Sequence, residues 1–290
     1  MKLARFYNLV VKFGSQRDPR KNKSAIKGYA DTAILYGSPQ TQIKKILVGI
    51  DMEVAELLLA DRIRQAQGLD LVLSHHPEGK AYVLLHEVMQ LQVDLLKQAG
   101  LDERIAQKFL DERKNEVERK ILPQNHTRPV DAARLLNLPF MCMHTPADNH
   151  VYQFLKKLME ARRPRYVQDI VNILEKIPEY REANKHLAGP RILLGSPGKE
   201  AGKIFFEMTG GTEGSKDIFG KLYQAGIRTL VSMHLSEEHL KKVKEAHLNV
   251  VIAGHIASDC LGLNLLLDRI EKEEKLEIIG CSGFKRIRRG

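Results

Sequence analysis

The chain lacks tryptophan altogether and is poor in aromatic side chains, which make up 6% of its 290 residues. This argues against a surface built to stack nucleic-acid bases, since such surfaces depend on exposed aromatic rings. The sequence has only three cysteines, Cys142, Cys260 and Cys281, which lie far apart and form no CxxC pair. We therefore expect reduced thiols in a cytoplasmic protein and no disulfide framework.

Long apolar runs are also missing, and none approaches the roughly 20 residues that a membrane span requires. The N-terminal stretch MKLARFYNLVVKFGSQRDPRK has too short an apolar segment for a secretory signal peptide and has no small-residue cleavage site. We therefore expect no membrane partner. A hydrophobic content of 43% and a charged content of 28% are ordinary for a soluble globular protein with one large domain or two smaller ones.

Positive charge is concentrated at the two ends of the chain, which has a formal net charge of +10. Up to residue 44 the many Lys and Arg residues are opposed only by Asp18 and Asp31, and the segment FKRIRRG forms a second basic cluster. Such clusters attract nucleic acid or phosphorylated ligands. They are also typical of solvated, solubilising ends, which is the interpretation we favour because a lone basic tail has low specificity.

Strands and helices alternate regularly from residue 45 onward. KKILVGID predicts a strand, VAELLLADRIRQAQG an amphipathic helix and LDLVLS the next strand, which together have the length of a parallel βαβ crossover. Further predicted strands are PFMCMHT, RILLGS, KIFFEMTGG, RTLVSM, NVVIAG and KLEIIGCSG. Because helical segments separate most of them, we predict an α/β protein with two α/β halves, each with a largely parallel sheet flanked by helices.

The pattern also predicts a domain organisation. Residues 1–44 form a basic N-terminal segment that we expect to be irregular or partly helical. Residues 45–188 form the first α/β half, and residues 189–290 form the second, with Gly189 and Pro190 marking the boundary.

Two adjacent histidines stand out in the stretch LVLSHHPEG. His75 and His76 directly follow the predicted strand LDLVLS, and neutral imidazole is a preferred ligand for several divalent metal ions. The stretch HTPADNH carries His144 and Asp148 after the strand PFMCM. Because ligands collect at the carboxyl ends of parallel strands, we expect these side chains to face one cleft.

A third polar stretch, GHIASD, follows the strand NVVIA and carries His255 and Asp259. These residues are four apart at the start of a predicted helix, so they share one helix face. The predicted metal ligands are His75, His76, Asp148, His255 and Asp259. Such a mixed set of nitrogen and oxygen donors suits two Zn, Mn, Fe or Ni ions better than one, and it favours metal-assisted hydrolysis. Ordinary loop or core roles for these residues are the alternative.

The segments DLVLSHHP, HTPADNH and VIAGHIASD, in this order, resemble the three signature segments of the GTP cyclohydrolase 1 type 2 homologue family, the NIF-three-like proteins or domain of unknown function 34. KKILVGIDMEVAELLLADRIRQAQGLD also resembles the opening βαβ unit of this family, and VSMHLSEEHLKKVKEAHLN resembles the segment before its GHxxxE motif. Together these segments cover about half of the chain.

The resemblance implies a two-domain α/β protein with a dinuclear metal centre in a cleft between the halves, assembled into a homo-oligomer that is often a toroidal hexamer in the family. The family's adjacent histidines correspond to His75 and His76, its HTxxD aspartate to Asp148, and its GHxxxE pair to His255 and Asp259. The last residue departs from the family, which usually has Glu at this position. We expect the shorter Asp to alter the bridging geometry or to weaken the second ion.

Three further histidines are secondary candidates. His144 is expected to orient Asp148 from outside the ligand set or to touch the substrate, although burial beneath the loop is an equal alternative. His234 and His239 fall in a region that borders the cleft in the family. We expect one of them to act as general acid or base, and the alternative is an exposed histidine at a helix start.

The leading hypothesis is a cytoplasmic, dinuclear metal-dependent hydrolase that acts on a nucleotide-like or phosphorylated small molecule. The substrate class follows from the basic composition and from the family name. The alternative is a non-catalytic metal-binding adaptor or regulator that binds protein or nucleic acid, nucleic acid being the less favoured partner. A third hypothesis makes the ions purely structural.

Overall fold

The structure, a computed structural model, describes residues 1–289 and divides into two compact units. The first unit comprises Met1–Val88, Glu116–His150 and Asp259–Gly290, and the second comprises Met89–Asn115 and Val151–Ser258. The chain therefore passes repeatedly from one unit to the other, whereas the halves predicted from sequence are continuous. The predicted boundary at residue 189 falls inside the second unit.

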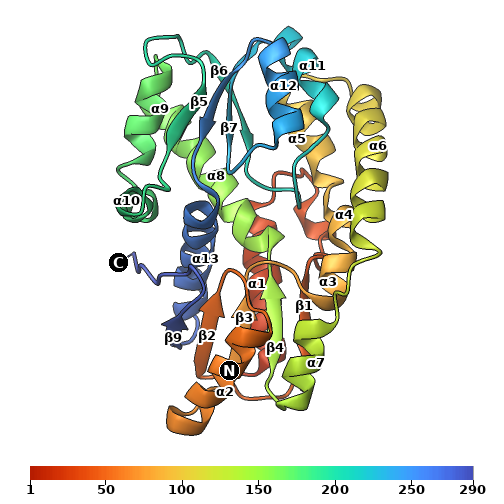
Figure 1. Ribbon diagram of the computed structural model, residues 1–290, viewed down its shortest axis with the longest axis vertical. Coiled ribbons are helices and arrows are strands. Elements are labelled where there is room, and N and C mark those ends of the chain that lie inside the picture. Colours follow the sequence, from red (N-terminus) through yellow and green to blue (C-terminus); the bar gives the residue numbers. More distant parts are fainter. Residues whose placement is uncertain (290) are drawn as a thin grey trace. The chain divides into compact units, whose positions relative to one another are not determined.

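The first unit is built on a five-stranded sheet with the order β1-β4-β3-β2-β9 (Figure 1). Its strands are β1 (Thr32–Tyr36), β2 (Lys45–Gly49), β3 (Leu71–Ser74), β4 (Phe140–Met143) and β9 (Glu277–Gly280). Strand β1 is antiparallel to β4, and all other neighbours are parallel. Val48 pairs with Leu73, which pairs with Met141, so the apolar residues of the three central strands lie side by side.

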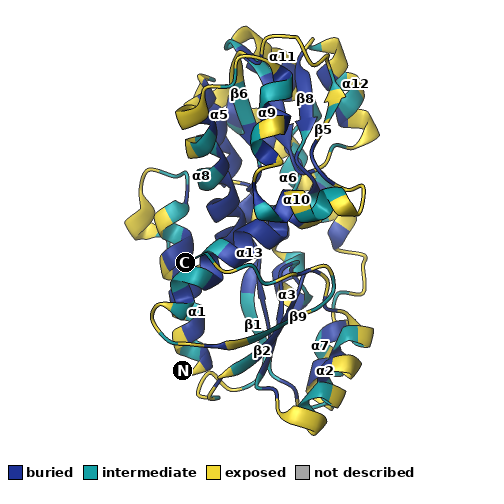
Figure 2. Ribbon diagram, turned by 90° about the vertical axis from the view of Figure 1, so that its left-hand side faces the viewer, coloured by how far each residue is buried: buried dark blue, intermediate teal, exposed yellow. Residues whose placement is uncertain are grey.

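Alternate side chains of this sheet enter two separate apolar layers. Ile46 and Val48 of β2 pack with helices α1 (Leu3–Arg17) and α13 (His255–Glu271) on one face. Leu47 packs with α2 (Val54–Gln67) and α7 (Arg128–Leu135) on the other face. Figure 2 shows β2 and most of α13 in the dark blue of buried residues. Burial on both faces explains why the strands are continuous apolar runs in the sequence.

The N-terminal segment is more regular than the sequence predicted. It forms α1, a 3-10 turn at Lys23–Ala25 and strand β1. Helix α1 buries Leu3, Phe6, Val10 and Phe13 along one face, in agreement with an amphipathic helix. The prediction missed this periodicity because charged residues alternate closely with the apolar ones.

Helix α1 approaches the start of α8 (Thr145–Arg162) closely at Gly14, where a Cβ atom would lie 2.7 Å from Cβ of Pro146. Gly14→Ala is therefore expected to lower the free energy of unfolding by about 1–3 kcal/mol through overpacking. Urea denaturation measures the change. Gly220→Ala is the matched control, because this helical glycine of α11 (Phe219–Gln224) has open space at its Cβ position. Equal stability of the two variants would contradict the prediction.

The second unit contains a four-stranded sheet with the order β5-β8-β7-β6. Its strands are β5 (Arg191–Leu194), β6 (Lys203–Glu207), β7 (Ile227–Ser232) and β8 (Asn249–Ile252). Strand β5 is antiparallel to β8, the other pairs are parallel, and β6 forms an edge. The remaining helices among residues 1–289, in either unit, are α3 (Gly79–Val83), α4 (Leu85–Val88), α5 (Leu91–Ala99), α6 (Glu103–Ile121), α9 (Val167–Leu174), α10 (Pro178–Lys185) and α12 (Glu237–Glu245), with a second 3-10 turn at Lys216–Ile218.

Two largely parallel sheets flanked by helices confirm the predicted α/β class. The last predicted strand, β9, pairs with β2 in the sheet of the first unit. Among residues 1–289, no helix combines the length and the apolar character that crossing a bilayer requires.

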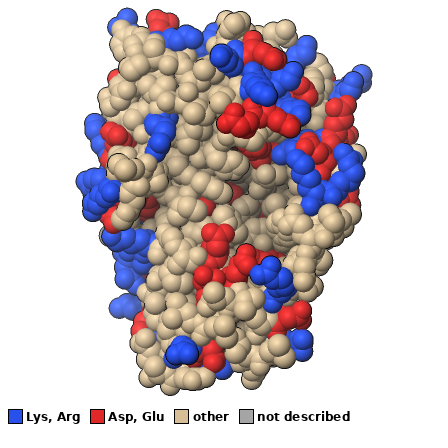
Figure 3. Space-filling model, viewed as in Figure 1, with Lys and Arg blue, Asp and Glu red and all other residues tan. Residues whose placement is uncertain are grey.

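The basic C-terminal cluster folds back on α13 of the same unit. Arg286 forms ion pairs with Asp268 and Glu271, and Arg288 pairs with Glu271. On the face of the molecule in Figure 3, Lys and Arg atoms are interspersed with Asp and Glu atoms. Part of the basic charge is therefore compensated within the fold, so the C-terminal cluster is packed against α13 and is not simply the solvated end that the sequence suggested.

Candidate metal centre

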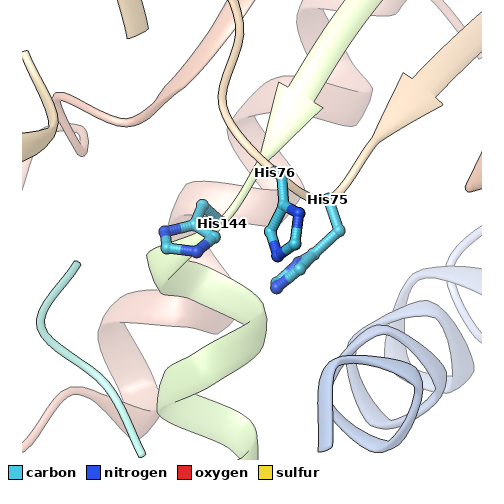
Figure 4. Close-up of side chains that lie close together, drawn as sticks. All are labelled: His75, His76 and His144. Carbon is cyan, nitrogen blue, oxygen red and sulfur yellow. The ribbon is translucent and has the colours of Figure 1, made fainter. Parts of the chain in front are cut away.

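Three imidazole rings meet at the carboxyl ends of two neighbouring strands of the first unit (Figure 4). His75 and His76 follow β3, and His144 follows β4 immediately before α8 begins. The ring centroids of His75 and His144 are 4.9 Å apart, those of His75 and His76 5.3 Å, and those of His76 and His144 5.9 Å. Parallel pairing of β3 with β4 brings these residues together, because it aligns the two strand ends.

The Nδ1 atom of each ring has a partner outside the cluster. His75 Nδ1 lies 3.2 Å from the carbonyl oxygen of Met143, and His76 Nδ1 lies 2.6 Å from Oδ1 of Asp51. His144 Nδ1 lies 2.9 Å from Oδ2 of Asp31. Histidines that bind metal commonly donate one ring N–H to a carbonyl or carboxylate, which fixes the ring and leaves the other nitrogen for the ion. This pattern selects Nε2 as the metal-facing atom of all three rings.

Asp31 is a functional candidate that the sequence did not reveal. It is fully buried just before β1, and its Oδ2 also accepts hydrogen bonds from the backbone N–H and the hydroxyl of Thr145. It is separated from His144 by 113 residues, so no local spacing connects the two. The antiparallel pairing of β1 with β4 brings Asp31 to the end of β4.

Two carboxylates complete the cluster. Nε2 of His75 lies 3.4 Å from Oδ1 of Asp148 and 3.5 Å from Oδ1 of Asp259. The corresponding distances are 3.5 Å from His76 to Asp259 and 3.7 Å from His144 to Asp148. These distances are long for charge-assisted hydrogen bonds. They are close to the spacing of about 3.4 Å between tetrahedral ligands that each lie 2.0–2.2 Å from one zinc ion.

The burial of this cluster provides a test of whether it fits a metal ion. Nε2 of His75 and Oδ1 of Asp148 are buried, and neither atom has a hydrogen-bond partner among residues 1–289. Buried polar atoms of native proteins nearly always have partners, so two such atoms facing each other need an explanation. The donor atoms of His75, Asp148 and Asp259 lie within 4.8 Å of one another, as do those of His75, His76 and His144. The residues therefore fit a bound cation.

The electrostatics of the cluster also favour positive charge. Burial lowers the pKa of His75, but the carboxylates of Asp259 and Asp148 outweigh this effect and raise it to about 10. Burial likewise lowers the pKa of His76, and Asp259 and Asp51 raise it to about 9. Without a metal ion, protons on the imidazoles compensate the buried carboxylates. A divalent cation can take their place.

The metal-free protein should therefore lose stability at alkaline pH. The pKa values of folded His75 and His76 lie above the ordinary value of 6.5, so their protonated forms contribute stability that is complete below pH 6.5. This contribution is lost as the pH rises through 9 and 10. Urea denaturation of chelator-treated protein between pH 7 and 10 measures the loss, and the metal-loaded protein is the control. If the difference in free energy of unfolding between the metal-free and metal-loaded forms does not change between pH 7 and 10, the prediction is wrong.

His255 begins α13 and belongs to the second unit, whereas Asp259 lies one helical turn later and belongs to the first. Positions i and i+4 share a helix face, as the sequence predicted. Within the second unit, the rings of His255 and His234 have centroids 4.8 Å apart. The role of His255 as a ligand stays a prediction.

His234 and His239 occupy different environments in the second unit. His239 is buried, with Nδ1 2.7 Å from the hydroxyl oxygen of Ser236 and Nε2 2.9 Å from the carbonyl oxygen of Gly214. Both ring nitrogens therefore have partners, which favours a structural role. His234 is 46% exposed at its side chain, and its Nδ1 lies 3.5 Å from Oε1 of Glu213. Burial raises the pKa of Glu213, but hydrogen bonds from His234 and the Ser236 backbone outweigh it and lower the pKa to about 2.

The sequence matches no family model and no curated protein. Among solved structures, the chain is similar to a NIF3 superfamily protein from Sphaerobacter thermophilus, with 26% identity, a TM-score of 0.81 and coverage of 98% of each chain. Reduced HcgD from Methanocaldococcus jannaschii has 15% identity and a TM-score of 0.59 over 97% of each chain. The protein ybgI, of unknown function, has 14% identity and a TM-score of 0.53 over 97% of this chain and 98% of that one. The similarity to these last two proteins shows only that they share the fold of this chain.

The fold and the buried cluster define an α/β protein with two largely parallel sheets and a group of His and Asp residues that could hold a metal ion. In fold and over nearly its whole length the chain is similar to the NIF3 superfamily protein from Sphaerobacter thermophilus. This finding confirms the family resemblance in the sequence motifs.

Proposed function

We propose that this protein is a metal-dependent hydrolase that holds two divalent transition-metal ions and acts on a phosphorylated or nucleotide-like small molecule. One observation carries the proposal. Each of three imidazoles is fixed through Nδ1, and two of the Nε2 atoms lie 3.4 to 3.7 Å from a carboxylate oxygen of Asp148. Hydrogen bonding alone does not account for this arrangement, but metal coordination does.

The proposed donors lie at the ends of β3 and β4 and on helices α8 and α13. They are His75, His76, His144, Asp148, Asp259 and His255. His144 is included as a ligand and not only as an orienting residue, because its ring lies with the other two imidazoles. Bound divalent ions would supply Lewis acidity and activate water for hydrolysis.

The residues of the chain hold these donors in place and set the direction of access. Asp31, Asp51 and the Met143 carbonyl fix the orientation of the rings. The side chain of His75 is fully buried, whereas that of His76 is 24% exposed. A substrate would therefore approach from the side of His76.

Acidic side chains near His76 bear on how a phosphorylated substrate would bind. Burial, followed by the nearby carboxylates of Glu53 and Asp51, raises the pKa of Glu78 to about 7. Like charges repel a phosphate, so its binding would depend on the bound ions for compensation. We therefore expect metal removal to weaken the binding of phosphoesters as well as to abolish their turnover.

Elemental analysis combined with a panel of nucleotides and phosphoesters tests the proposal. Supporting results are close to two ions per chain and a turnover that chelation abolishes and metal addition restores. A fully metal-loaded protein that turns over none of the compounds would overturn the hydrolase assignment. Tight nucleic-acid binding with a steep salt dependence, unaffected by chelator, would then favour the adaptor alternative.

A further inference from the structure

A cavity of about 560 Å³ lies within the second unit, and none of the residues that line it belongs to the metal cluster. Residues from the end of α5, the part of α8 after residue 151 and the edge strand β6 line it. Strand β6 is an edge strand of the sheet, and residues 203–206 of it line the cavity. The volume is in the range of sites that bind small organic molecules.

Part of the lining of the cavity is apolar. Leu95 of α5, Met159 of α8, Phe206 of β6 and Ile227 of β7 line it, and each of them is buried. These side chains come from four different elements, so the surface is formed by the packing of the unit. It suits the hydrocarbon part of a ligand.

Cationic side chains also line the cavity. Lys156, Arg163 and Lys203 line the cavity together with one acid, Glu160. Lys156 Nζ donates to the amide oxygen of Gln98 at 3.1 Å, and Lys203 Nζ donates to the Ala99 carbonyl at 2.7 Å. These acceptors are neutral, so they position the ammonium groups without cancelling their charge.

No ion pair links these three cations to a carboxylate among residues 1–289. Three cations and one acid leave an excess of two positive charges in a lining that also contains buried apolar side chains. Such an excess attracts an anionic group, and it is the complement of an amphipathic anion.

Tyr152 adds a neutral hydrogen-bond donor on the same face of α8, one turn before Lys156. Burial, followed by the nearby Glu160 carboxylate, raises its pKa to about 12, so its hydroxyl keeps its proton at neutral pH. The oxygen accepts from Lys156 Nζ at 3.4 Å, and the hydroxyl hydrogen has no acceptor among residues 1–289. A ligand oxygen could accept it.

From these observations we propose that the second unit binds an amphipathic organic anion in this cavity. Its carboxylate or phosphate group would contact Lys156, Arg163 and Lys203, and its apolar part would cover Met159 and Phe206. The proposal does not depend on the function of the metal cluster.

Isothermal titration calorimetry of the full-length protein with octyl phosphate and octanoate tests it, and octanol is the neutral control. The double variant Lys156→Gln/Arg163→Gln is expected to weaken binding by at least about tenfold, because it removes two charge-assisted contacts. The charge-matched control is Lys157→Gln/Arg162→Gln, which changes exposed neighbours on α8 that do not line the cavity. Binding of this control should stay within about twofold of the original. The anion that binds more tightly, octyl phosphate or octanoate, shows whether the cavity prefers a phosphate or a carboxylate.

A second readout locates the ligand. The methyl carbon signal of Met159, identified with Met159→Leu, should shift on saturation in protein labelled at its eight methionines. Chelation of metal should leave both the affinity and the shift unchanged. The proposal is overturned if neither anion binds, if the two double variants bind equally well, or if the Met159 signal does not move.

Discussion

Asp148→Asn is expected to lower the affinity for divalent metal by about 100-fold or more. The carboxylate of Asp148 is buried and lies 3.4 Å from Nε2 of His75 and 3.7 Å from Nε2 of His144. Asn has nearly the same shape but no charge, so the variant removes an anionic donor without leaving a cavity. Loss of a residue that only orients a ligand already costs 10- to 100-fold, and loss of a ligand should cost at least as much.

Metal content after dialysis and calorimetric titration with zinc or manganese measure this effect. Asp131→Asn makes the same chemical change on the exposed side of α7, where Asp131 pairs with Arg134. It should leave metal affinity unchanged and stability within about 1 kcal/mol. If Asp148→Asn binds metal as tightly as the Asp131 control, the cluster is not a metal centre that uses Asp148.

Asp31→Asn is expected to weaken metal binding by about 10- to 100-fold and also to destabilise the fold. Asp31 is fully buried, and its Oδ2 accepts from His144 Nδ1 at 2.9 Å and from the Thr145 hydroxyl at 2.6 Å. Neutralising this carboxylate loosens the His144 ring and weakens several buried hydrogen bonds at once. The free energy of unfolding should fall by about 3–5 kcal/mol, which is typical of a broken buried charged network.

Thr145→Val separates the two expected effects of Asp31→Asn, the loss of metal affinity and the loss of stability. The substitution removes the hydroxyl contact to Asp31 but leaves the hydrogen bond to His144 in place. It should lower stability by about 1–3 kcal/mol with little change in metal affinity. Calorimetry and urea denaturation of both variants are the measurements. Equal loss of metal affinity in the two would show that Asp31 acts through general stability and not through His144.

Most of the fold could be predicted because its central strands are short apolar runs bounded by turn residues. Strands β2, β3 and β4 are buried along their length, so their sequences carry a strong signal. Strand β1 was missed because it is an edge strand whose last four residues are only partly buried. The place of β9 beside β2 could not be predicted either, since 232 residues separate the paired positions and nothing local encodes the pairing.

The candidate site divides in the same way. His75, His76, His144 and Asp148 could be found because each follows a strand that the sequence reveals, and parallel pairing brings the strand ends together. Asp31 and Asp51 could not be found from the sequence. Each is a single carboxylate in a loop, and it lies far along the chain from the imidazole that it contacts. The close association of His144 with the other two rings depends on the register of β3 and β4, which the sequence does not specify.

The raised pKa values of His75 and His76 link occupancy of the centre to the acidity of its surroundings. When no ion is bound, both rings are protonated on both nitrogens at neutral pH and carry a positive charge. Metal binding must therefore release protons into solution. Apparent affinity should then rise by about tenfold per pH unit for each proton released. At a constant concentration of free metal, acidification would lower the occupancy of the centre and a rise in pH would increase it. Binding of metal to this protein is therefore an exchange of protons for divalent metal ions.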